Sequence, residues 1–239
     1  MQALRRPEKV LGVLGGMGPA ATAEFLRLLA ERAPAARDQE HGIVYVLSDP
    51  QIPDRSSAIL GEGEDPTDRL RRGLMALADW GADLLAVPCN TAHYFIDRFR
   101  DELPVPLVHI VEETVREAGE IGPRGSWLLS TLGTMQSGLF QSEAERSGYS
   151  LLAPPKEDQL AVQRCIQLVK EGRTGDAGVI LKEVVERLWN ERDIPVCVAC
   201  TELPLAYEAS GLPAERAVSS LKALCDACLR SVYDQGSIS

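Results

Sequence analysis

The sequence lacks the usual features of a membrane protein and of a nucleic-acid-binding protein. Its 239 residues include no apolar run near the ~20 residues that a membrane-spanning helix needs. No run of basic residues is longer than the arginine pairs at 5–6 and 71–72, and 25 basic residues face 35 acidic ones. Nucleic-acid-binding domains usually show the opposite balance or a dense basic patch. We therefore expect neither a membrane nor a nucleic acid as a partner.

The sequence also lacks a clear secretion signal. Basic residues, an apolar stretch and small residues do follow one another at the N-terminus, as they do in a signal peptide. Pro19 and the glycines at 12, 15, 16 and 18 interrupt the apolar stretch, which favours a strand followed by a glycine-rich loop. Six cysteines could form disulfides, but a chain of this size without a secretion signal does not need them. We predict a cytoplasmic protein with reduced thiols.

Short apolar runs alternate with longer amphipathic segments along the chain. The predicted strands are KVLGVL, IVYVLS, DLLAVP, VPLVHI, SWLLS, SLLAP and PVCVA, and helical patterns such as AATAEFLRLLAERA lie between most of them. Nearly continuous apolar strands separated by helices predict an α/β fold, with parallel sheets covered on both faces. The turn cluster GPRG at 122–125 indicates a boundary between two halves near residues 101–124.

The two halves carry a weak internal repeat. LGGMGPAATAEF at 14–25 aligns with LSTLGTMQSGLF at 129–140, and PCNT at 88–91 aligns with ACTE at 199–202. Because the two alignments have nearly the same offset, we expect each half to contain a glycine-bearing turn between strand and helix and a cysteine at a strand end.

Cys89 is a candidate for chemistry. It follows the predicted strand DLLAVP, and open parallel sheets bind their ligands at the carboxyl ends of strands. A helix beginning at about Asn90 or Thr91 would bring its first amides to the thiol and lower the pKa of the cysteine. The alternative is a structural cysteine, because free cysteine is among the most buried residue types.

Cys200 repeats this pattern after the strand PVCVA, where Thr201 and Glu202 open the next turn. Two thiols at equivalent strand ends can face each other across a cleft. Such a pair suits the removal of a proton from one face of a carbon and its return to the opposite face, since each thiol can act as acid or base.

The other motifs support weaker functional interpretations. Cys197, Cys200, Cys225 and Cys228 form two C-x2-C pairs, but the first lies in a predicted strand and the second in a helical pattern, which disfavours both a zinc site and a thioredoxin-like site. The loop GVLGGMGPAA loosely matches a dinucleotide fingerprint, with Asp49 too distant to be its acidic residue. Its glycines could instead let a small carboxylate approach the amides of a helix that starts near Pro19.

Three polar side chains are ambiguous. Arg55, in a loop that follows the second strand, is either a carboxylate anchor or a solvated arginine. Lys170 lies near the end of a helical stretch, where a cation is favourable without any ligand. His93 comes one helical turn after Cys89 and could orient a neighbour, accept a proton or simply form a structural hydrogen bond.

Taken together, GVLGGMGPAAT, PDRS, VPCNTAH, TLGTMQSGLF and ACTELP resemble the aspartate/glutamate racemase family, in particular its aspartate racemase and broad-specificity amino-acid racemase branch. The resemblance implies two pseudo-symmetric α/β domains, each a parallel sheet flanked by helices, with the active site in the cleft between them. One domain would comprise residues 1–105 and 210–239, and the other residues 106–209. It also implies a homodimer that uses neither pyridoxal phosphate nor another cofactor, and no metal.

The resemblance further implies residue roles. Cys89 and Cys200 would be the two acid/base residues, acting on opposite faces of the substrate Cα. The implied substrate-binding residues are Met17, Gln51, Arg55, Asn90, Thr91, Thr131, Lys170 and Thr201. Ala199 stands where the family often has glycine. We expect a racemase of aspartate, glutamate or a broader set of amino acids, with maleate isomerisation, hydantoin racemisation and non-catalytic carboxylate binding as alternatives.

Overall fold

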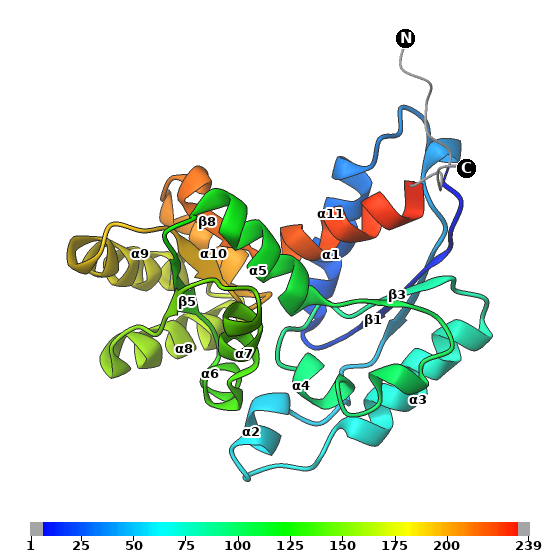
Figure 1. Ribbon diagram of the computed structural model, residues 1–239, viewed down its shortest axis with the longest axis horizontal. Coiled ribbons are helices and arrows are strands. Elements are labelled where there is room, and N and C mark those ends of the chain that lie inside the picture. Colours follow the sequence, from blue (N-terminus) through cyan, green and yellow to red (C-terminus); the bar gives the residue numbers. More distant parts are fainter. Residues whose placement is uncertain (1–6, 234–239) are drawn as a thin grey trace.

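The computed structural model describes residues 7–233, which form two lobes built on two parallel sheets (Figure 1). The sheet of the first lobe has the order β2-β1-β3-β4, and the sheet of the second lobe has the equivalent order β6-β5-β7-β8. The two-sheet α/β architecture expected from the sequence is therefore confirmed. The strands are β1 (Leu11–Gly15), β2 (Val44–Ser48), β3 (Leu84–Ala86), β4 (Leu107–Val108), β5 (Ser126–Leu129), β6 (Leu151–Leu152), β7 (Val196–Val198) and β8 (Ala217–Ser219).

Helices cover both faces of each sheet. In the first lobe, Leu14 and Leu85 pack under α3 and α4, and in the second lobe Leu129 and Val198 pack under α8, α9 and α10. The helices are α1 (Pro19–Arg32), α2 (Arg55–Ile59), α3 (Thr67–Asp79), α4 (His93–Ile96), α5 (Ile110–Ile121), α6 (Leu132–Ser137), α7 (Leu139–Arg146), α8 (Lys156–Lys170), α9 (Thr174–Glu191), α10 (Leu203–Ser210) and α11 (Ser220–Tyr233). No helix within this described part of the chain is long and apolar enough to cross a membrane.

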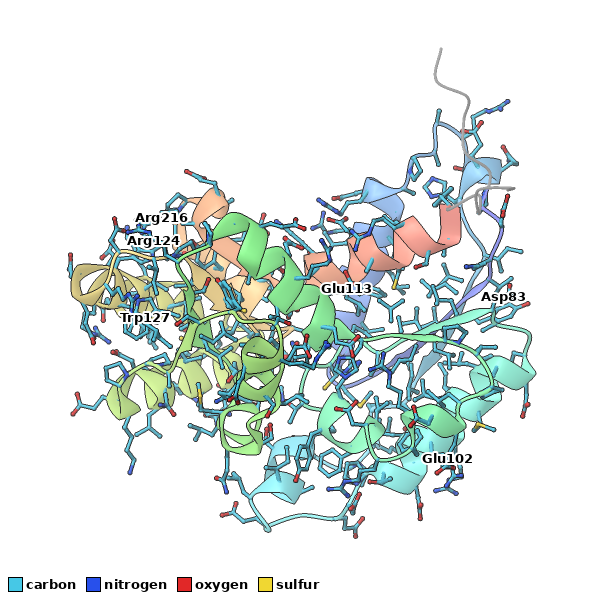
Figure 2. All side chains as sticks on the ribbon, in the orientation of Figure 1. Asp83, Glu102, Glu113, Arg124, Trp127 and Arg216 are labelled. Carbon is cyan, nitrogen blue, oxygen red and sulfur yellow. The ribbon has the colours of Figure 1, made fainter. Side chains whose placement is uncertain are left out.

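Besides the hydrophobic core on the outer face of each sheet, a third hydrophobic core joins the two lobes. It contains Val13 from β1 and Leu128 from β5, together with apolar side chains of α1, α5, α7 and α11. The helices α5 and α11, which follow β4 and β8, pack against each other between the sheets (Figure 1). Glu113 on α5, labelled in Figure 2, forms an ion pair of 2.7 Å with Arg230 on α11. The inner faces of both sheets are therefore buried in one shared core.

The pairing of the strands indicates where the chain passes from one lobe to the other. β4, at residues 107–108, pairs with β3 in the first sheet, and β8, at residues 217–219, pairs with β7 in the second. We propose that the chain passes from one domain to the other after these two strands. The first crossing then falls a few residues beyond position 105, and the second falls after Ser219 rather than at position 209 as expected from the sequence.

The turn after β1 is tightly packed and leads directly into α1. A Cβ at Gly15 would lie 2.3 Å from Cγ2 of Thr22, and Gly16 has a φ of +92°. Only glycine allows both this approach and this backbone conformation without strain. Pro19 occupies the first turn of α1, as predicted. The loop thus places Met17 and Gly18 at the carboxyl end of the first sheet.

The segment after Cys89 differs from the prediction. We expected a helix from about residue 90, but residues 90–92 form a turn and α4 covers only His93–Ile96. The backbone leaves the helical region at Phe99, with φ -139° and ψ 12°, and continues as the short 3-10 helix Arg100–Glu102. Phe95, Ile96 and Phe99 are all buried, so packing of these side chains decides the backbone path here.

Candidate active site

A small buried cavity lies where residues that follow β1, β3, β5 and β7 come together. Its volume is about 20 Å³, which is close to the space that one water molecule occupies. The cavity is lined by Met17, Asp54, Arg55, Ser56, Cys89, Asn90, Thr91, Thr131, Lys170, Cys200, Thr201 and Glu202. Both candidate cysteines therefore line one cavity, at the strand ends where ligands of parallel sheets bind.

All the site residues expected from the sequence line this cavity except Gln51. The side chain of Gln51 is exposed, and its Oε1 accepts a hydrogen bond of 3.1 Å from Nη2 of Arg69. The same arginine forms a 2.6 Å ion pair with Asp49. Gln51 thus belongs to a polar group at the rim of the first sheet and lies outside the cavity.

The backbone carbonyl of Cys89 contacts the buried side chain of His93. Nδ1 of His93 lies 2.9 Å from the carbonyl oxygen of Cys89, so the imidazole N–H donates to that carbonyl. Burial, followed by the nearby His109, lowers the pKa of His93 well below its ordinary value and keeps the ring neutral. The ring does not line the cavity, which disfavours proton transfer to His93 and leaves orientation of Cys89 or a structural hydrogen bond as its role.

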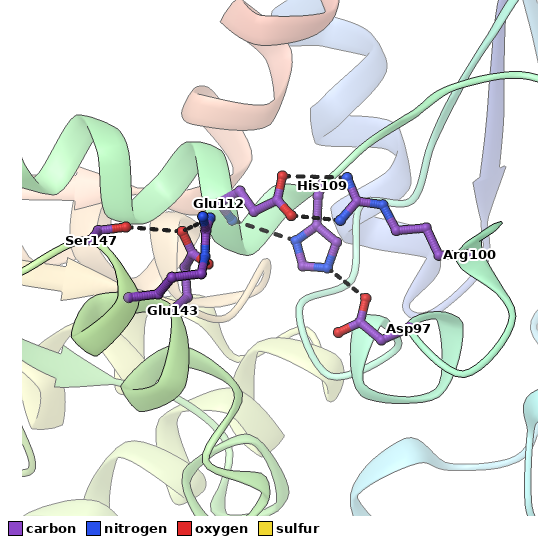
Figure 3. Close-up of polar contacts among 7 residues, drawn as sticks. Asp97, Arg100, His109, Glu112, Glu143 and Ser147 are labelled. Carbon is purple, nitrogen blue, oxygen red and sulfur yellow. Dashed lines mark hydrogen bonds and ion pairs between the residues drawn. The ribbon is translucent and has the colours of Figure 1, made fainter.

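His109 extends this support towards the surface. Its ring packs edge-on against His93 with centroids 4.5 Å apart. Its Nε2 lies 3.0 Å from Oδ1 of Asp97 (Figure 3). Its Nδ1 accepts the amide N–H of Glu112 and caps α5. Glu112 in turn pairs with Arg100 at 2.5 Å. The polar network thus connects the turn that carries Cys89 with the first crossing helix.

Cys200 has a carboxylate as its direct partner. Its Sγ lies 3.2 Å from Oε2 of Glu202, and both side chains are buried. Burial and the negative charge of Glu202 raise the pKa of Cys200 well above its ordinary value, although Lys170 acts in the opposite direction. We expected surroundings that favour the thiolate, and this expectation is wrong for Cys200 in the ligand-free protein, where the thiol keeps its proton.

Two buried polar atoms of the cavity residues have no hydrogen-bond partner within the described chain, and one is an acceptor whereas the other is a donor. Asn90 is 2% exposed; its Nδ2 donates to Oγ of Ser220 at 2.8 Å, while its Oδ1 has no donor. Arg55 donates Nη1 to the carbonyls of Ile52 and Pro53, while its Nε has no acceptor. A buried polar group without a partner costs about 1–3 kcal/mol, so these atoms favour a ligand that carries both a donor and an acceptor.

Threonine hydroxyls connect the two lobes beside the cysteines. Oγ1 of Thr91, from the turn after β3, lies 2.8 Å from Oγ1 of Thr134 and 3.3 Å from Oγ1 of Thr131. Thr131 caps α6 by accepting the amide N–H of Thr134 at 3.0 Å. Each hydroxyl can donate one hydrogen bond and accept others, so the cluster can redirect its donors towards a bound anion.

Lys170 supplies a flexible positive charge at the edge of the cavity. It is the last residue of α8 and is exposed to solvent. Asp54 lies nearby; burial opposes its ionisation, but hydrogen bonds from Ser57 and the charges of Arg55 and Lys170 keep its pKa below the ordinary value. The cavity therefore contains two cations and two carboxylates, and each carboxylate already accepts hydrogen bonds from the protein.

The two C-x2-C pairs do not form one site. Cys197 packs in the core shared by the lobes with Cys225 and Cys228, whereas Cys200 belongs to the outer core of the second lobe. Among residues 7–233, no three side chains of His, Cys, Asp or Glu lie close enough together to hold a metal ion.

Sequence reasoning missed four residues of this region. Glu202, Asp54 and Ser56 line the cavity, and Thr134 completes the hydroxyl cluster. Glu202 had a visible signal, because it is an acidic residue two positions after the candidate cysteine. The others depend on how α2 and α6 meet across the lobes, which no local pattern reveals.

Comparisons with known proteins agree with this geometry. The sequence profile of the family Asp/Glu/Hydantoin racemase matches residues 14–228. The chain is 27% identical over 201 residues to the broad specificity amino-acid racemase RacX of Bacillus subtilis (strain 168), which covers 81% of this chain and 86% of the relative. It is 31% identical over 134 residues to the glutamate racemase of Aquifex aeolicus (strain VF5), a match that spans 54% of this chain and 50% of that enzyme.

Solved structures have the same fold. The Picrophilus torridus aspartate racemase superposes with a TM-score of 0.84 at 28% identity, covering 94% of each chain. The Thermus thermophilus glutamate racemase, solved in complex with beta-chloro-D-alanine, superposes with a TM-score of 0.66 at 20% identity, covering 95% of this chain and 80% of that one. The match of the family profile over most of the chain, together with the two-sheet fold, shows that this protein belongs to the Asp/Glu/hydantoin racemase family and is a racemase.

Proposed function

We propose that the protein racemises an acidic amino acid, with aspartate as the first candidate, by proton transfer between Cα and the two thiols of Cys89 and Cys200. The observation that carries this proposal is that both thiols line one small, buried and otherwise polar cavity. Two-base inversion at Cα needs a base on one face and an acid on the opposite face, and a thiol can serve in either role.

The unpartnered atoms of the cavity support an amino acid as the ligand. Oδ1 of Asn90 would accept an N–H of the substrate ammonium group, and Nε of Arg55 would donate to a carboxylate. The hydroxyls of Thr91, Thr131 and Thr201 line the same cavity and can donate to the α-carboxylate. Donors fixed around that carboxylate stabilise the negative charge that spreads onto it when Cα loses its proton.

The two cations support an acidic substrate. Both carboxylates of the cavity already accept hydrogen bonds from the protein, so the charge of Lys170 can be directed to a second carboxylate on the ligand. A broad-specificity racemase and an aspartate racemase are both among the relatives, so neutral amino acids are the natural comparison in a substrate test.

The proposed step is balanced without a cofactor. The Cα–H bond breaks as one thiolate takes the proton and forms an S–H bond. On the opposite face, the S–H bond of the other thiol breaks and a new Cα–H bond forms. The charges of the two sulfurs are exchanged, and no electron is transferred to another group.

The cavity must widen before this reaction can begin. A space of about 20 Å³ holds one water molecule and is too small for an amino acid. Residues from both lobes line it, so a small separation of the lobes would admit the substrate, and their return would exclude water. Exclusion of water strengthens each electrostatic contact with the developing carbanion.

The test is the loss of optical activity of L- and D-aspartate, L- and D-glutamate and L-alanine, with reduced protein in the presence of EDTA. We expect both enantiomers of aspartate to approach a racemic mixture, with slower reaction of alanine. Cys89→Ala and Cys200→Ala should each abolish racemisation. Cys165→Ala is the matched control, because Cys165 is buried in α8 away from the cavity and should keep its activity. Racemisation at the wild-type rate by both alanine variants would contradict the proposal.

A further inference from the structure

Ser220, the first residue of α11, makes a buried hydrogen bond with a residue of the cavity. Its Oγ accepts Nδ2 of Asn90 at 2.8 Å, although 130 residues separate the two in the chain. Ser220 is 0% exposed and Asn90 is 2% exposed, so water does not compete for this contact. Ser220 follows β8 of the second sheet, whereas Asn90 lies in the turn after β3 of the first. The hydrogen bond therefore joins the turn that carries Cys89 to the helix that follows the second sheet.

The start of α11 does not need the hydroxyl of Ser220. The preceding residue, Ser219, accepts the amide N–H of Lys222 on its Oγ at 3.4 Å and so serves the first turn of the helix. Within residues 7–233, the hydrogen bond that Oγ of Ser220 makes is the one with Asn90. Burial of a hydroxyl costs free energy unless it has a partner, and alanine in a helix avoids that cost. The serine is therefore explained by its contact with Asn90 rather than by the helix.

This contact decides which end of the Asn90 amide is left for a ligand. A side-chain amide has a donor end and an acceptor end of nearly the same shape, and a half-turn of the amide exchanges them. With Nδ2 bound to Ser220, the free end is Oδ1, which has no partner within the described chain. Because Asn90 lines the cavity, an acceptor is offered there to a ligand group that donates, such as an ammonium group.

We propose that Ser220 is a positioning residue that makes the site specific for a protonated α-amino group, by holding the Asn90 amide with its oxygen towards the ligand. This inference rests on the proposed function, in which an amino acid occupies the cavity. Ser220 itself does not line the cavity and acts through Asn90. Without the hydroxyl of Ser220, the amide can turn over and present Nδ2, a donor with which an ammonium group cannot form a hydrogen bond.

The test compares the binding of aspartate and malate, which carry an ammonium group and a hydroxyl, respectively, at the same carbon. Dissociation constants are measured by calorimetry with racemic mixtures, whose composition racemisation cannot change. The hydroxyl of malate donates or accepts, so it fits either orientation of the amide. In Ser220→Ala we expect Kd to rise about tenfold for aspartate and to change less than about twofold for malate, because the lost contact is a charge-assisted hydrogen bond. An equal rise for both ligands would indicate a merely structural role and would overturn the inference.

Two further variants separate the orientation of Asn90 from the packing around it. Ser219→Ala is the matched control, because it removes the neighbouring hydroxyl and should lower stability without changing the ratio of the two Kd values. In an Asn90→Ala background, Ser220→Ala should not change that ratio further, because the amide that it holds is gone. A further change of the same size in that background would show that Ser220 does not act through Asn90.

A second measurement needs no ligand. The side-chain amide protons of Asn90 are identified in a proton–nitrogen NMR spectrum by their loss in Asn90→Ala. We expect Ser220→Ala to speed their exchange with heavy water about tenfold relative to Ser219→Ala, because the hydrogen bond that protects them is lost. Unchanged exchange would show that Ser220 does not hold the amide. If the wild type bound neither aspartate nor malate, the proposed substrate would be wrong, while this exchange would still decide whether Ser220 holds Asn90.

Discussion

A methyl group added at Gly133 should impair activity more than stability. Gly133 lies in α6 of the second lobe, and a Cβ there would lie 2.6 Å from Cα of Ser56 in α2 of the first lobe, where ordinary contacts begin at 3.4 Å. Cα of Ser56 belongs to the backbone and cannot rotate away as a side-chain atom could. The two helices must therefore separate. Because Arg55 and Ser56 in α2 and Thr131 at the start of α6 line the cavity, this separation opposes closure of the site.

The size of the effect follows from that contact. Overpacking of this kind costs about 1–3 kcal/mol, which corresponds to a loss of about 5- to 150-fold in kcat/KM if the closed state bears the whole cost. The gain in helix propensity from glycine to alanine, about 1 kcal/mol, offsets part of the cost to folding. We therefore expect urea unfolding to change by about 1 kcal/mol or less, while aspartate racemisation falls by at least fivefold.

Gly175→Ala is the matched control for this prediction. Gly175 lies in the first turn of α9, and no atom lies within 4 Å of a Cβ at that position. The substitution should raise the free energy of unfolding slightly and leave kcat/KM unchanged. If Gly133→Ala racemised aspartate at the wild-type kcat/KM, the closed contact between α2 and α6 would have no part in the reaction.

Three further predictions concern single groups. Burial raises the pKa of Cys197 to about 12, so the folded state keeps a proton that the unfolded state loses above pH 9, and stability falls with rising pH. The stabilisation of wild type relative to Cys197→Ala should therefore shrink as the pH rises from 9 to 10.5, with a slope that approaches about 1.4 kcal/mol per pH unit at the upper end, and a constant difference in urea unfolding would contradict this. Arg55→Lys keeps the charge but loses the two hydrogen bonds from Nη1 to the carbonyls of Ile52 and Pro53, so it should lower the unfolding free energy by about 1–3 kcal/mol. An unchanged urea midpoint would refute that role. Thr134→Val removes one hydroxyl from the cluster between the lobes and should cost about 1 kcal/mol of stability and raise KM for aspartate, with Thr134→Ser, which keeps the hydroxyl, as the control.

The strands were predictable from sequence because burial on both faces gives them continuous apolar runs. Each of the seven predicted runs overlaps a strand, from Leu11–Gly15 to Val196–Val198. β8, with the short sequence AVS, has no such run and is defined only by its pairing with β7. The order of the strands is the same in both sheets, which explains the weak repeat between residues 14–25 and 129–140.

The site was less predictable where tertiary packing decides it. Cys89 and Cys200 follow directly from strand ends, but the helix expected after Cys89 is broken because Phe99 turns into the core. The expectation of a thiolate at Cys200 is wrong for a related reason, since the buried carboxylate of Glu202, in the same turn, lies 3.2 Å from the thiol. Local patterns locate a candidate cysteine, whereas its ionisation depends on contacts that only the folded chain brings together.

The most direct test of the two-thiol account is the position of deuterium during the first turnovers of L-aspartate in heavy water. Two bases on opposite faces predict that newly formed D-aspartate carries deuterium at Cα, while the remaining L-aspartate keeps its original proton. The reverse reaction of D-aspartate should give the mirror result. Deuterium that entered the remaining L-aspartate as fast as the D-product would indicate a single base, and the roles of Cys89 and Cys200 proposed for this cavity would then be wrong.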